Sequence, residues 1–146
     1  MKLLGIDYGT KRIGIALSDD EGVLAFPCSV ITSQCKPLST SAWIKYVADK
    51  IKELCEKEKV GAIVIGESRD FKQKENPIMP AVRALKAALE RETGLPVYFE
   101  PEMLTSAQAR RLPAKQEKTR QPHKRTNVDA SAAALILQGY IDRQRN

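Results

Sequence analysis

The stretch LLGIDYGTKRIGIALSDDEGVLAFP, residues 3–27, contains three short apolar runs that are separated by turn residues. The first run, residues 3–6, leads directly to Asp7, and the second covers residues 13–17. The third, residues 22–27, follows a turn rich in acidic residues. Strands joined by connections this short pair in antiparallel fashion. The stretch therefore predicts a three-stranded antiparallel meander at the start of the chain.

The rest of the chain predicts two further strands and four helices. Helices are expected where apolar residues recur at spacings of three and four, and strands where β-rich residues form short continuous runs. In chain order we expect a loop at 28–37, a helix at 38–59, a strand at 60–66, a helix at 78–93 closed by Gly94, a strand at 95–99, a short helix starting after Leu104 within the capping box of Thr105 and Gln108, and a helix at 127–143. Trp43 belongs to the apolar stripe of the first helix, which predicts a core position rather than a base-stacking surface.

This order predicts an α/β fold in one domain that covers residues 1–146. The meander would supply three antiparallel strands of a mixed five-stranded sheet, and parallel βα units would supply the other two, with helices flanking the sheet. A length of 146 residues and 42% hydrophobic residues suit one globular core. No apolar run reaches the roughly 20 residues that span a bilayer, so we expect no membrane association. Three cysteines without metal-like spacing predict free thiols in a reducing cytoplasm.

The net charge of +6 has its source in one segment, residues 108–125. This segment holds seven of the 24 basic residues and one of the 18 acidic residues, so the rest of the chain is balanced. A basic segment on a neutral body predicts an anionic partner such as nucleic acid. The alternative is a solvated loop without a ligand. We expect a basic, flexible loop over about residues 110–126, with nucleic-acid contacts from Arg110, Arg111, Lys115, Lys118, Arg120, Lys124 and Arg125.

Three acids lie where functional groups gather in a sheet of this kind, at strand ends and at the start of a helix. Asp7 follows the first strand, Glu102 (or else Glu100) follows the fifth, and Asp129 lies in the first turn of the last helix. Converging carboxylates repel one another unless a cation lies between them, and Mg²⁺ prefers oxygen ligands. We therefore expect a site for Mg²⁺ or Mn²⁺, with two ions about 4 Å apart and Asp7 bridging them.

Each of these acids also has a structural interpretation. Asp7 would cap the following turn through a hydrogen bond to its own backbone. Glu102 and Asp129 would each lie near a helix N-terminus, where the helix dipole favours an acid.

The turn after the first strand carries a second candidate function. Gly9 is expected to relieve a backbone constraint there. Three residues beside it, Thr10, Lys11 and Arg12, are expected to contact phosphate, and a solvated turn is the alternative. His123 lies between a proline and a lysine and is expected to be exposed rather than catalytic.

Four blocks of the sequence resemble one protein family. GIDYGTKRIGIALSD (5–19) closely resembles the opening motif of the YqgF family, which comprises bacterial RNase H-like proteins described as pre-16S rRNA nucleases or Holliday junction resolvases. VGAIVIG (60–66), EMLTSAQA (102–109) and VDASAAALILQGYID (128–142) resemble the family's fourth strand, its acidic strand-end motif and its C-terminal helix. The similarity covers nearly the whole chain.

The resemblance implies an RNase H-like sheet, divalent-metal catalysis and a nucleic-acid substrate. The family's three metal-binding carboxylates fall on Asp7, Glu102 and Asp129, the acids already selected by their positions.

Two departures from the family pattern bear on the substrate. The family's Asp-Glu-Arg at the strand end is Pro101-Glu102-Met103 here, so an arginine that would clamp a phosphate is missing. The usual Gly-Leu-Pro after the fourth strand is Gly-Glu-Ser, which places Glu67 at a strand end. Glu67 is expected to be either an added metal ligand or a solvated loop acid.

The sequence thus predicts a divalent-metal-dependent endonuclease, a hydrolase that cleaves phosphodiester bonds in structured RNA or branched DNA. Processing of the 5′ end of precursor 16S rRNA in ribosome biogenesis is the favoured activity. Holliday junction resolution in DNA recombination and repair is the alternative and requires paired active sites, so the chain is expected as a monomer or a homodimer. A catalytically inactive nucleic-acid-binding module remains a further alternative. Sugar kinases and actin-like ATPases share the Asp-x-Gly-Thr pattern, but they need a second domain for which we expect no room.

Neutralising Arg110, Arg111, Lys124 and Arg125 is expected to weaken nucleic-acid binding and to flatten its dependence on salt, because fewer counterions are released from phosphates. Binding measured at several salt concentrations tests this expectation. An unchanged slope of log affinity against log salt concentration would contradict phosphate contacts by these residues.

Overall fold

The chain forms five strands and three helices within the residues that the structure describes. This computed structural model describes the backbone of residues 1–9, 11–32, 39–67, 79–101 and 124–145, and their side chains except at 124–129. The elements in chain order are β1 (Leu3–Asp7), β2 (Arg12–Ser18), β3 (Ala25–Thr32), α1 (Thr40–Glu58), β4 (Ala62–Glu67), α2 (Met79–Thr93), β5 (Val97–Pro101) and α5 (Lys124–Arg145).

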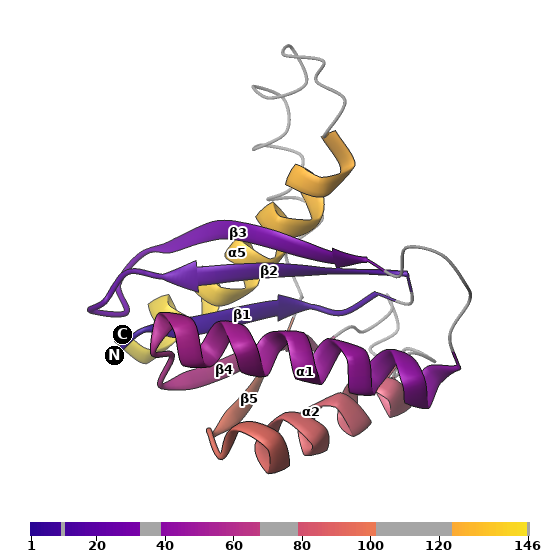
Figure 1. The fold of residues 1–146 in the computed structure, drawn as a ribbon. Helices are drawn as coiled ribbons and strands as arrows, with labels where there is room; N and C mark the ends of the chain where they lie inside the picture. Colours follow the sequence, from indigo (N-terminus) through magenta and orange to yellow (C-terminus); the bar gives the residue numbers. More distant parts are fainter. Residues whose placement is uncertain (10, 33–38, 68–78, 102–123, 146) are drawn as a thin grey trace.

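The five strands form one mixed sheet in the order β3-β2-β1-β4-β5. β1, β2 and β3 pair in antiparallel fashion, whereas β4 runs parallel to both β1 and β5. The predicted meander and the predicted parallel units are therefore confirmed. β1 lies at the centre, where the antiparallel half of the sheet meets the parallel half (Figure 1).

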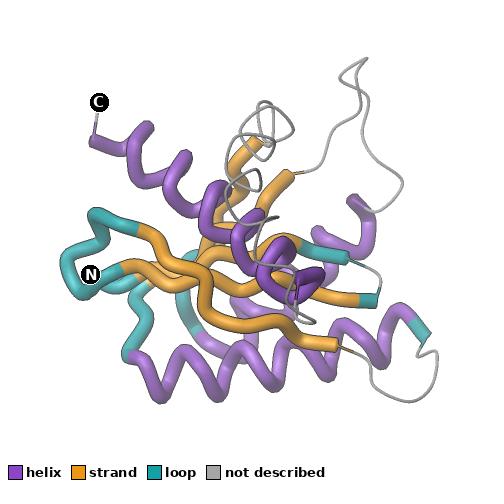
Figure 2. The backbone as a smooth tube through the Cα atoms, turned by 90° about the horizontal axis from the view of Figure 1, so that it is seen from above, coloured by secondary structure: helices purple, strands orange, loops and turns teal. Residues whose placement is uncertain are grey.

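Helices cover both faces of the sheet. α1 and α2 pack on one face, and α5 crosses the other face in contact with all five strands (Figures 1 and 2). Strand alternation decides which side chains enter which layer. Leu4 and Ile6 of β1 are buried on the α1–α2 side, and Leu3 is buried on the α5 side. Because both faces are covered, β1 and β4 are apolar almost throughout.

Gly5 sets the distance between α5 and the centre of the sheet. A Cβ atom on Gly5 would lie 2.7 Å from Cβ of Leu137 and 3.0 Å from the carbonyl oxygen of Ala133. Both atoms belong to α5, so a side chain at this position would push the helix away from β1. The absence of a side chain at Gly5 therefore permits α5 to pack closely on the central strand.

The third strand differs from the prediction. It covers Ala25–Thr32 rather than residues 22–27, so the loop expected from residue 28 begins later. The preceding turn is longer because the Asp19 carboxylate accepts hydrogen bonds from the N–H groups of Val23 (2.7 Å) and Leu24 (3.1 Å). β3 lies at the edge of the sheet and much of it is exposed, which explains why it lacks a buried-strand pattern.

The last helix also differs from the prediction, because it starts at Lys124 rather than at 127. Lys and Arg are good helix formers, and nothing after Pro122 interrupts the helix. The predicted basic loop of residues 110–126 is thus wrong for its last three residues. Asp129 consequently lies in the second turn of the helix, and no acid lies in the first turn.

The other elements follow the predictions closely. The buried residues of α1 are Trp43, Ile44, Val47, Ala48, Ile51 and Cys55, so the core position of Trp43 is confirmed. Gly94 closes α2 with a positive φ of 70°, as expected for a C-terminal cap. β5 extends to Pro101, two residues further than predicted. The expected short helix after Leu104 lies outside the described residues.

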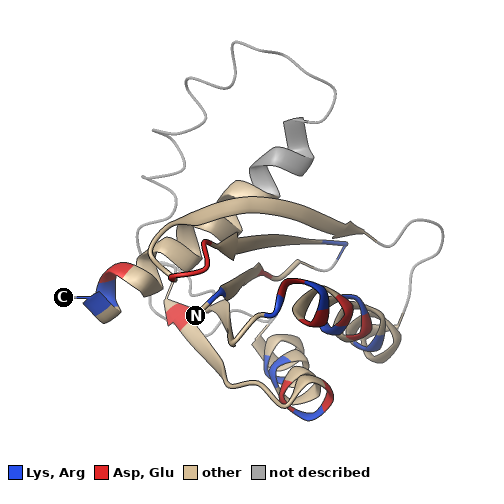
Figure 3. Cartoon of the chain, turned by 60° about the vertical axis from the view of Figure 1, so that its left-hand side comes forward, with Lys and Arg blue, Asp and Glu red and all other residues tan. Residues whose placement is uncertain are grey.

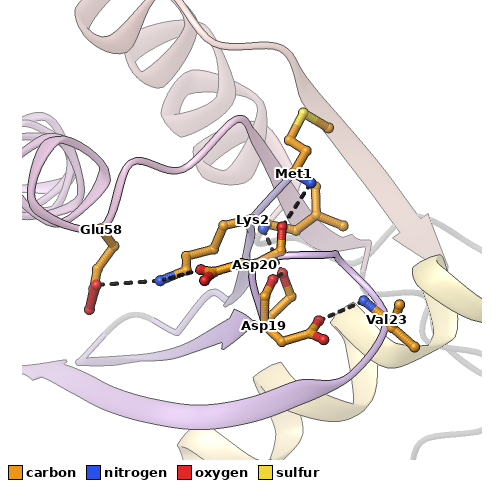
Figure 4. A network of polar contacts seen from close by, with 8 residues as sticks. Met1, Lys2, Asp19, Asp20, Val23 and Glu58 are labelled. Atoms are coloured by element: carbon orange, nitrogen blue, oxygen red, sulfur yellow. Dashed lines mark hydrogen bonds and ion pairs between the residues drawn. The ribbon is translucent and has the colours of Figure 1, made fainter.

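The N-terminal end of β1 is joined to its neighbours by a polar network (Figure 4). The Lys2 ammonium lies 3.4 Å from the Asp20 carboxylate and 3.6 Å from that of Glu58, while the Met1 amino group donates to the carbonyl oxygen of Asp20 (2.9 Å). The network ties β1 to the β2–β3 turn and to the end of α1.

Two cysteines of the described chain, Cys28 and Cys55, are free thiols. Burial raises the pKa of the Cys55 thiol to about 11, so this thiol stays protonated at neutral pH. No helix in the described ranges is long and apolar enough to cross a membrane.

Gly5→Ala is expected to destabilise the protein by about 1–3 kcal/mol, because the added methyl group overlaps α5. Gly139→Ala is the matched control, since a Cβ there would meet no atom within 4 Å. That change is expected to be neutral or to stabilise α5 by up to about 1 kcal/mol. Urea unfolding measures both variants, and equal stability of the two would contradict the close approach at Gly5.

Candidate active site

The carboxyl ends of β1, β4 and β5 lie at one edge of the sheet, because these three strands are parallel. Asp7 is the last residue of β1, Glu67 is the last residue of β4, and Pro101 is the last residue of β5. The register pairs Ile6 with Ile65 and Glu67 with Pro101, so the ends of the three strands are neighbours. We call this edge the β1–β4–β5 edge. It brings together the strand ends that were predicted to carry the acids.

The side chains of Asp7 and Glu67 lie on opposite faces of the sheet. By strand alternation, Asp7 shares the face of Leu3, which packs under α5. Glu67 shares the face of Ile63 and Ile65, which pack under α1 and α2. The two acids thus lie at adjacent strand ends, but a shared ligand would require Glu67 to reach around the end of β4.

α5 is oriented so that its beginning lies toward this same edge. Gln138 accepts a hydrogen bond from the N–H of Ala25 (2.9 Å), at the opposite end of the sheet. Five residues earlier in the helix, Ala133 lies against Gly5 of β1. Going back along α5 therefore leads toward the end of β1, and Asp129 lies one further turn in that direction. The backbone of this predicted ligand is thus on the α5 face, near the β1–β4–β5 edge.

Glu100, the alternative to Glu102, is part of an ion pair. It is 3% exposed, and both of its carboxylate oxygens accept hydrogen bonds of 2.8 Å from Nη1 of Arg143 in α5. A buried carboxylate is stable only with such partners. Glu100 therefore joins β5 to the end of α5. Glu102, one residue beyond Pro101, lies outside the described residues.

The turn after Asp7 depends on a close backbone approach at Gly9. A Cβ atom there would overlap the carbonyl oxygen of Arg12, and the φ angle of Gly9 is not positive. The predicted backbone constraint is therefore a close contact rather than a left-handed conformation. Tyr8 is packed against the α1–α2 core, and burial raises the pKa of its phenol. The Trp43 side chain donates a hydrogen bond to the carbonyl oxygen of Gly9 (Nε1···O 3.1 Å).

Sequence reasoning placed Trp43 in the core but missed this hydrogen bond. One signal could have found it: a buried tryptophan normally needs an acceptor for its indole N–H. Which acceptor it finds is decided by the packing of α1 against β1, which does not follow from the spacing of apolar residues.

Of the predicted phosphate-binding residues, Lys11 and Arg12 are exposed at the end of the sheet where Asp7 lies. Lys124 and Arg125 are in the first turn of α5, and only their backbone is described. The other predicted contacts, Thr10, Arg110, Arg111, Lys115, Lys118 and Arg120, lie outside the described residues, as does His123.

The outer faces of α1 and α2 carry interspersed charges of both signs (Figure 3). Lys86 pairs with Glu90 one turn later at 2.9 Å, and Lys45 lies 4.0 Å from Asp49. These described helices therefore offer no surface of a single charge sign to a phosphate backbone.

Within the part of the chain that the structure describes, no three His, Cys, Asp or Glu side chains form a group that could hold a metal ion. Glu102 and the side chain of Asp129 lie outside the described part of the chain. The metal ligands predicted from the sequence therefore remain a prediction.

The sheet order, with an aspartate at the end of the central strand and a helix crossing the same face, is that of the RNase H-like fold. Two solved structures share this fold. RuvC from Thermus thermophilus has a TM-score of 0.64 and 18% identity, with 99% of this chain and 96% of that chain covered. The yeast mitochondrial Holliday junction resolvase has a TM-score of 0.58 and 15% identity, with coverage of 98% and 78%. At these identities the comparison shows the fold.

The sequence defines the family more closely. The model of the RuvX family, described as Holliday junction resolvase, matches residues 1–143. Relatives from Moorella thermoacetica (36% identity, 98% of this chain and 96% of the relative) and Limosilactobacillus fermentum (32%, 97% and 94%) each bear the name "Putative pre-16S rRNA nuclease". The chain belongs to the RuvX family, for which YqgF is the other name. It is an enzyme, a hydrolase that acts on phosphodiester bonds, as the sequence predicted.

Arg143→Met is expected to destabilise the protein by about 1–3 kcal/mol, because the buried Glu100 carboxylate loses two hydrogen bonds from a charged donor. Arg145→Met removes an exposed charge from the same end of α5 and is expected to change stability by less than about 0.5 kcal/mol. Urea unfolding at neutral pH measures the difference. If the two variants were equally stable, the ion pair would not hold α5 on β5.

Proposed function

We propose that this enzyme is a divalent-metal-dependent endonuclease that processes the 5′ end of precursor 16S rRNA. The observation that carries the proposal is the β1–β4–β5 edge, where Asp7 ends the central strand on the face that is covered by α5. On that face Ala133 of α5 lies against Gly5 of β1, and Asp129 precedes Ala133 by about one turn in the direction of the end of β1. Relatives at 32–36% identity over almost the whole chain carry the name of this nuclease, which supports the choice of substrate.

The proposed metal ligands are Asp7, Glu102 and Asp129, and Glu67 is an additional candidate. The donor set fits the proposed ions, because all four are carboxylates and Mg²⁺ and Mn²⁺ prefer oxygen ligands. Two bound ions would supply Lewis-acid activation of water and stabilisation of the leaving oxygen. The chain itself contributes rigid placement: Asp7 lies on a strand paired on both sides, and Asp129 lies on a helix of 22 residues.

Basic residues are proposed to hold the substrate backbone beside these acids. The register pairs Asp7 with Gly14, so Arg12 starts β2 beyond the end of β1, and Lys11 precedes it. Both side chains are exposed, which supports the proposal that they contact phosphates flanking the cleaved bond. Thr10 and the basic segment of residues 110–125 would extend this contact along a structured RNA.

Holliday junction cleavage is the second candidate function, and the description of the RuvX family favours it. A structure with the same fold, T. thermophilus RuvC, was solved in complex with a Holliday junction substrate (TM-score 0.63, 18% identity). Symmetric cleavage of a branched DNA requires two active sites, so this activity would need a homodimer, whereas rRNA processing is open to a monomer. Either activity would be carried out in the cytoplasm, which suits the free Cys28 and Cys55 thiols.

Asp7→Asn is expected to abolish cleavage of precursor 16S rRNA while leaving RNA binding largely intact, because it removes a charged metal ligand and keeps the shape of the side chain. The loss should exceed the roughly 10- to 100-fold that changes to outer-shell residues cost. Matched precursor-rRNA and four-way-junction substrates, each with and without Mg²⁺, decide between the two functions. Glu67→Gln measured in parallel shows whether this acid is also a ligand.

Asp49→Asn on the exposed face of α1 is the control and is expected to cleave like the wild type. Cleavage that survives Asp7→Asn would contradict the proposed mechanism. Binding without metal-dependent cleavage in the wild type would instead identify a nucleic-acid-binding module.

A further inference from the structure

Trp43, the only tryptophan in the chain, joins α1 to the turn that follows Asp7. It lies near the start of α1 and is 3% exposed. Its indole Nε1 lies 3.1 Å from the carbonyl oxygen of Gly9, which is 34 residues earlier in the chain. The acceptor belongs to the second residue after Asp7. The hydrogen bond therefore connects a helix of the core with the candidate active site.

The turn that receives this hydrogen bond has little freedom. Asp7 is paired with Gly14 across the β1–β2 ladder, and this pairing fixes one side of the turn. Gly9 lies so close to the Arg12 carbonyl that no side chain fits there. The ladder between β1 and β2 ends at the pair of Asp7 with Gly14, so it does not reach the Gly9 peptide. Trp43 supplies a donor to this peptide.

Trp43 is itself held firmly in place. α1 starts with a Ser39 cap, whose hydroxyl accepts a hydrogen bond from the N–H of Ala42 (3.2 Å). The Trp43 ring is stacked with that of Tyr46 at a centroid distance of 6.1 Å, and the Lys50 ammonium lies 5.7 Å from the Tyr46 ring centre. The next residue, Ile44, is buried in the core. The indole donor thus has a fixed position relative to the sheet.

We propose that Trp43 is a positioning residue for the active site, which acts through the Gly9 carbonyl to hold Asp7, Lys11 and Arg12 in their working arrangement. The inference rests on the proposed function, because it assumes that Asp7 binds a metal ion. Trp43 is buried, so its effect on the site is exerted through the turn and not through a contact with substrate or metal. Its hydrogen bond fixes the turn from the α1 side, while the β2 ladder fixes it from the other.

Trp43→Phe tests this role, since phenylalanine keeps an aromatic ring in the core and lacks the donor. The loss of one hydrogen bond is expected to raise the Mn²⁺ concentration needed for half-maximal cleavage by about three- to tenfold. Direct titration of Mn²⁺ without substrate should show the same loss of affinity. Leu54→Ala is the control, because Leu54 packs against the same core from the same helix, away from the turn. It should lower the Tm without changing the dependence on Mn²⁺.

A second measurement uses the single indole N–H directly. Its resonance in a ¹H–¹⁵N spectrum needs no assignment, and in the wild type we expect slow exchange with solvent. Mn²⁺ should broaden this resonance, and Asp7→Asn should prevent the broadening because the ion loses its central ligand. Rapid exchange of the indole proton would show that the hydrogen bond is not maintained in solution.

The outcomes separate this inference from the function on which it rests. If the wild type cleaves with Mn²⁺ and Trp43→Phe shows the same metal dependence as Leu54→Ala, the positioning role is wrong and the nuclease proposal stands. If the wild type neither cleaves nor binds Mn²⁺ in a manner that depends on Asp7, the proposed function fails, and the positioning role fails with it.

Discussion

The close approach of α5 to β1 at Gly5 is the contact on which the rest of the structure depends. The Cβ atom of Leu137 and the carbonyl oxygen of Ala133 occupy the space that a side chain at Gly5 would need. Because the helix lies so near the central strand, it contacts all five strands and covers one face of the sheet. The same contact aligns the start of α5, with Asp129, toward the end of β1. A glycine in the middle of a strand is normally unfavourable, and here it permits the packing that places the candidate site.

Polar contacts at both ends of the sheet join its strands to the helices. At the N-terminal end of β1, Lys2 pairs with Asp20 and Glu58, and the backbone of Ala25 binds Gln138 of α5. The Gln138 contact at this end holds α5 on β3, and the ion pair of buried Glu100 with Arg143 holds the end of α5 on β5. The other end carries the strand termini, the Asp7 turn and the beginning of the helix.

The charge of the chain is divided in a related way. The described helices α1 and α2 carry both signs in close succession, as in the Lys86–Glu90 pair, and such exposed pairs contribute little to stability. The positive surplus belongs to residues 108–125, between the end of β5 and the first residues of α5. Both flanking elements reach the candidate site.

The sequence by itself determined the order of elements, the mixed sheet and the position of Asp7 at a strand end, because alternation and helical spacing are local properties. Apolar periodicity also placed Trp43 in the core. The sequence pattern misplaced β3 by several residues. The Asp19 carboxylate lengthens the turn before this strand, and an exposed edge strand lacks the apolar pattern of a buried one. Only the tertiary structure showed that the side chains of Asp7 and Glu67 lie on opposite faces of the sheet. It also showed the ion pair of Glu100 with Arg143 and the hydrogen bond from Trp43 to Gly9. Each of these depends on the register of strands or on helix packing between residues far apart in the chain, which no local pattern encodes.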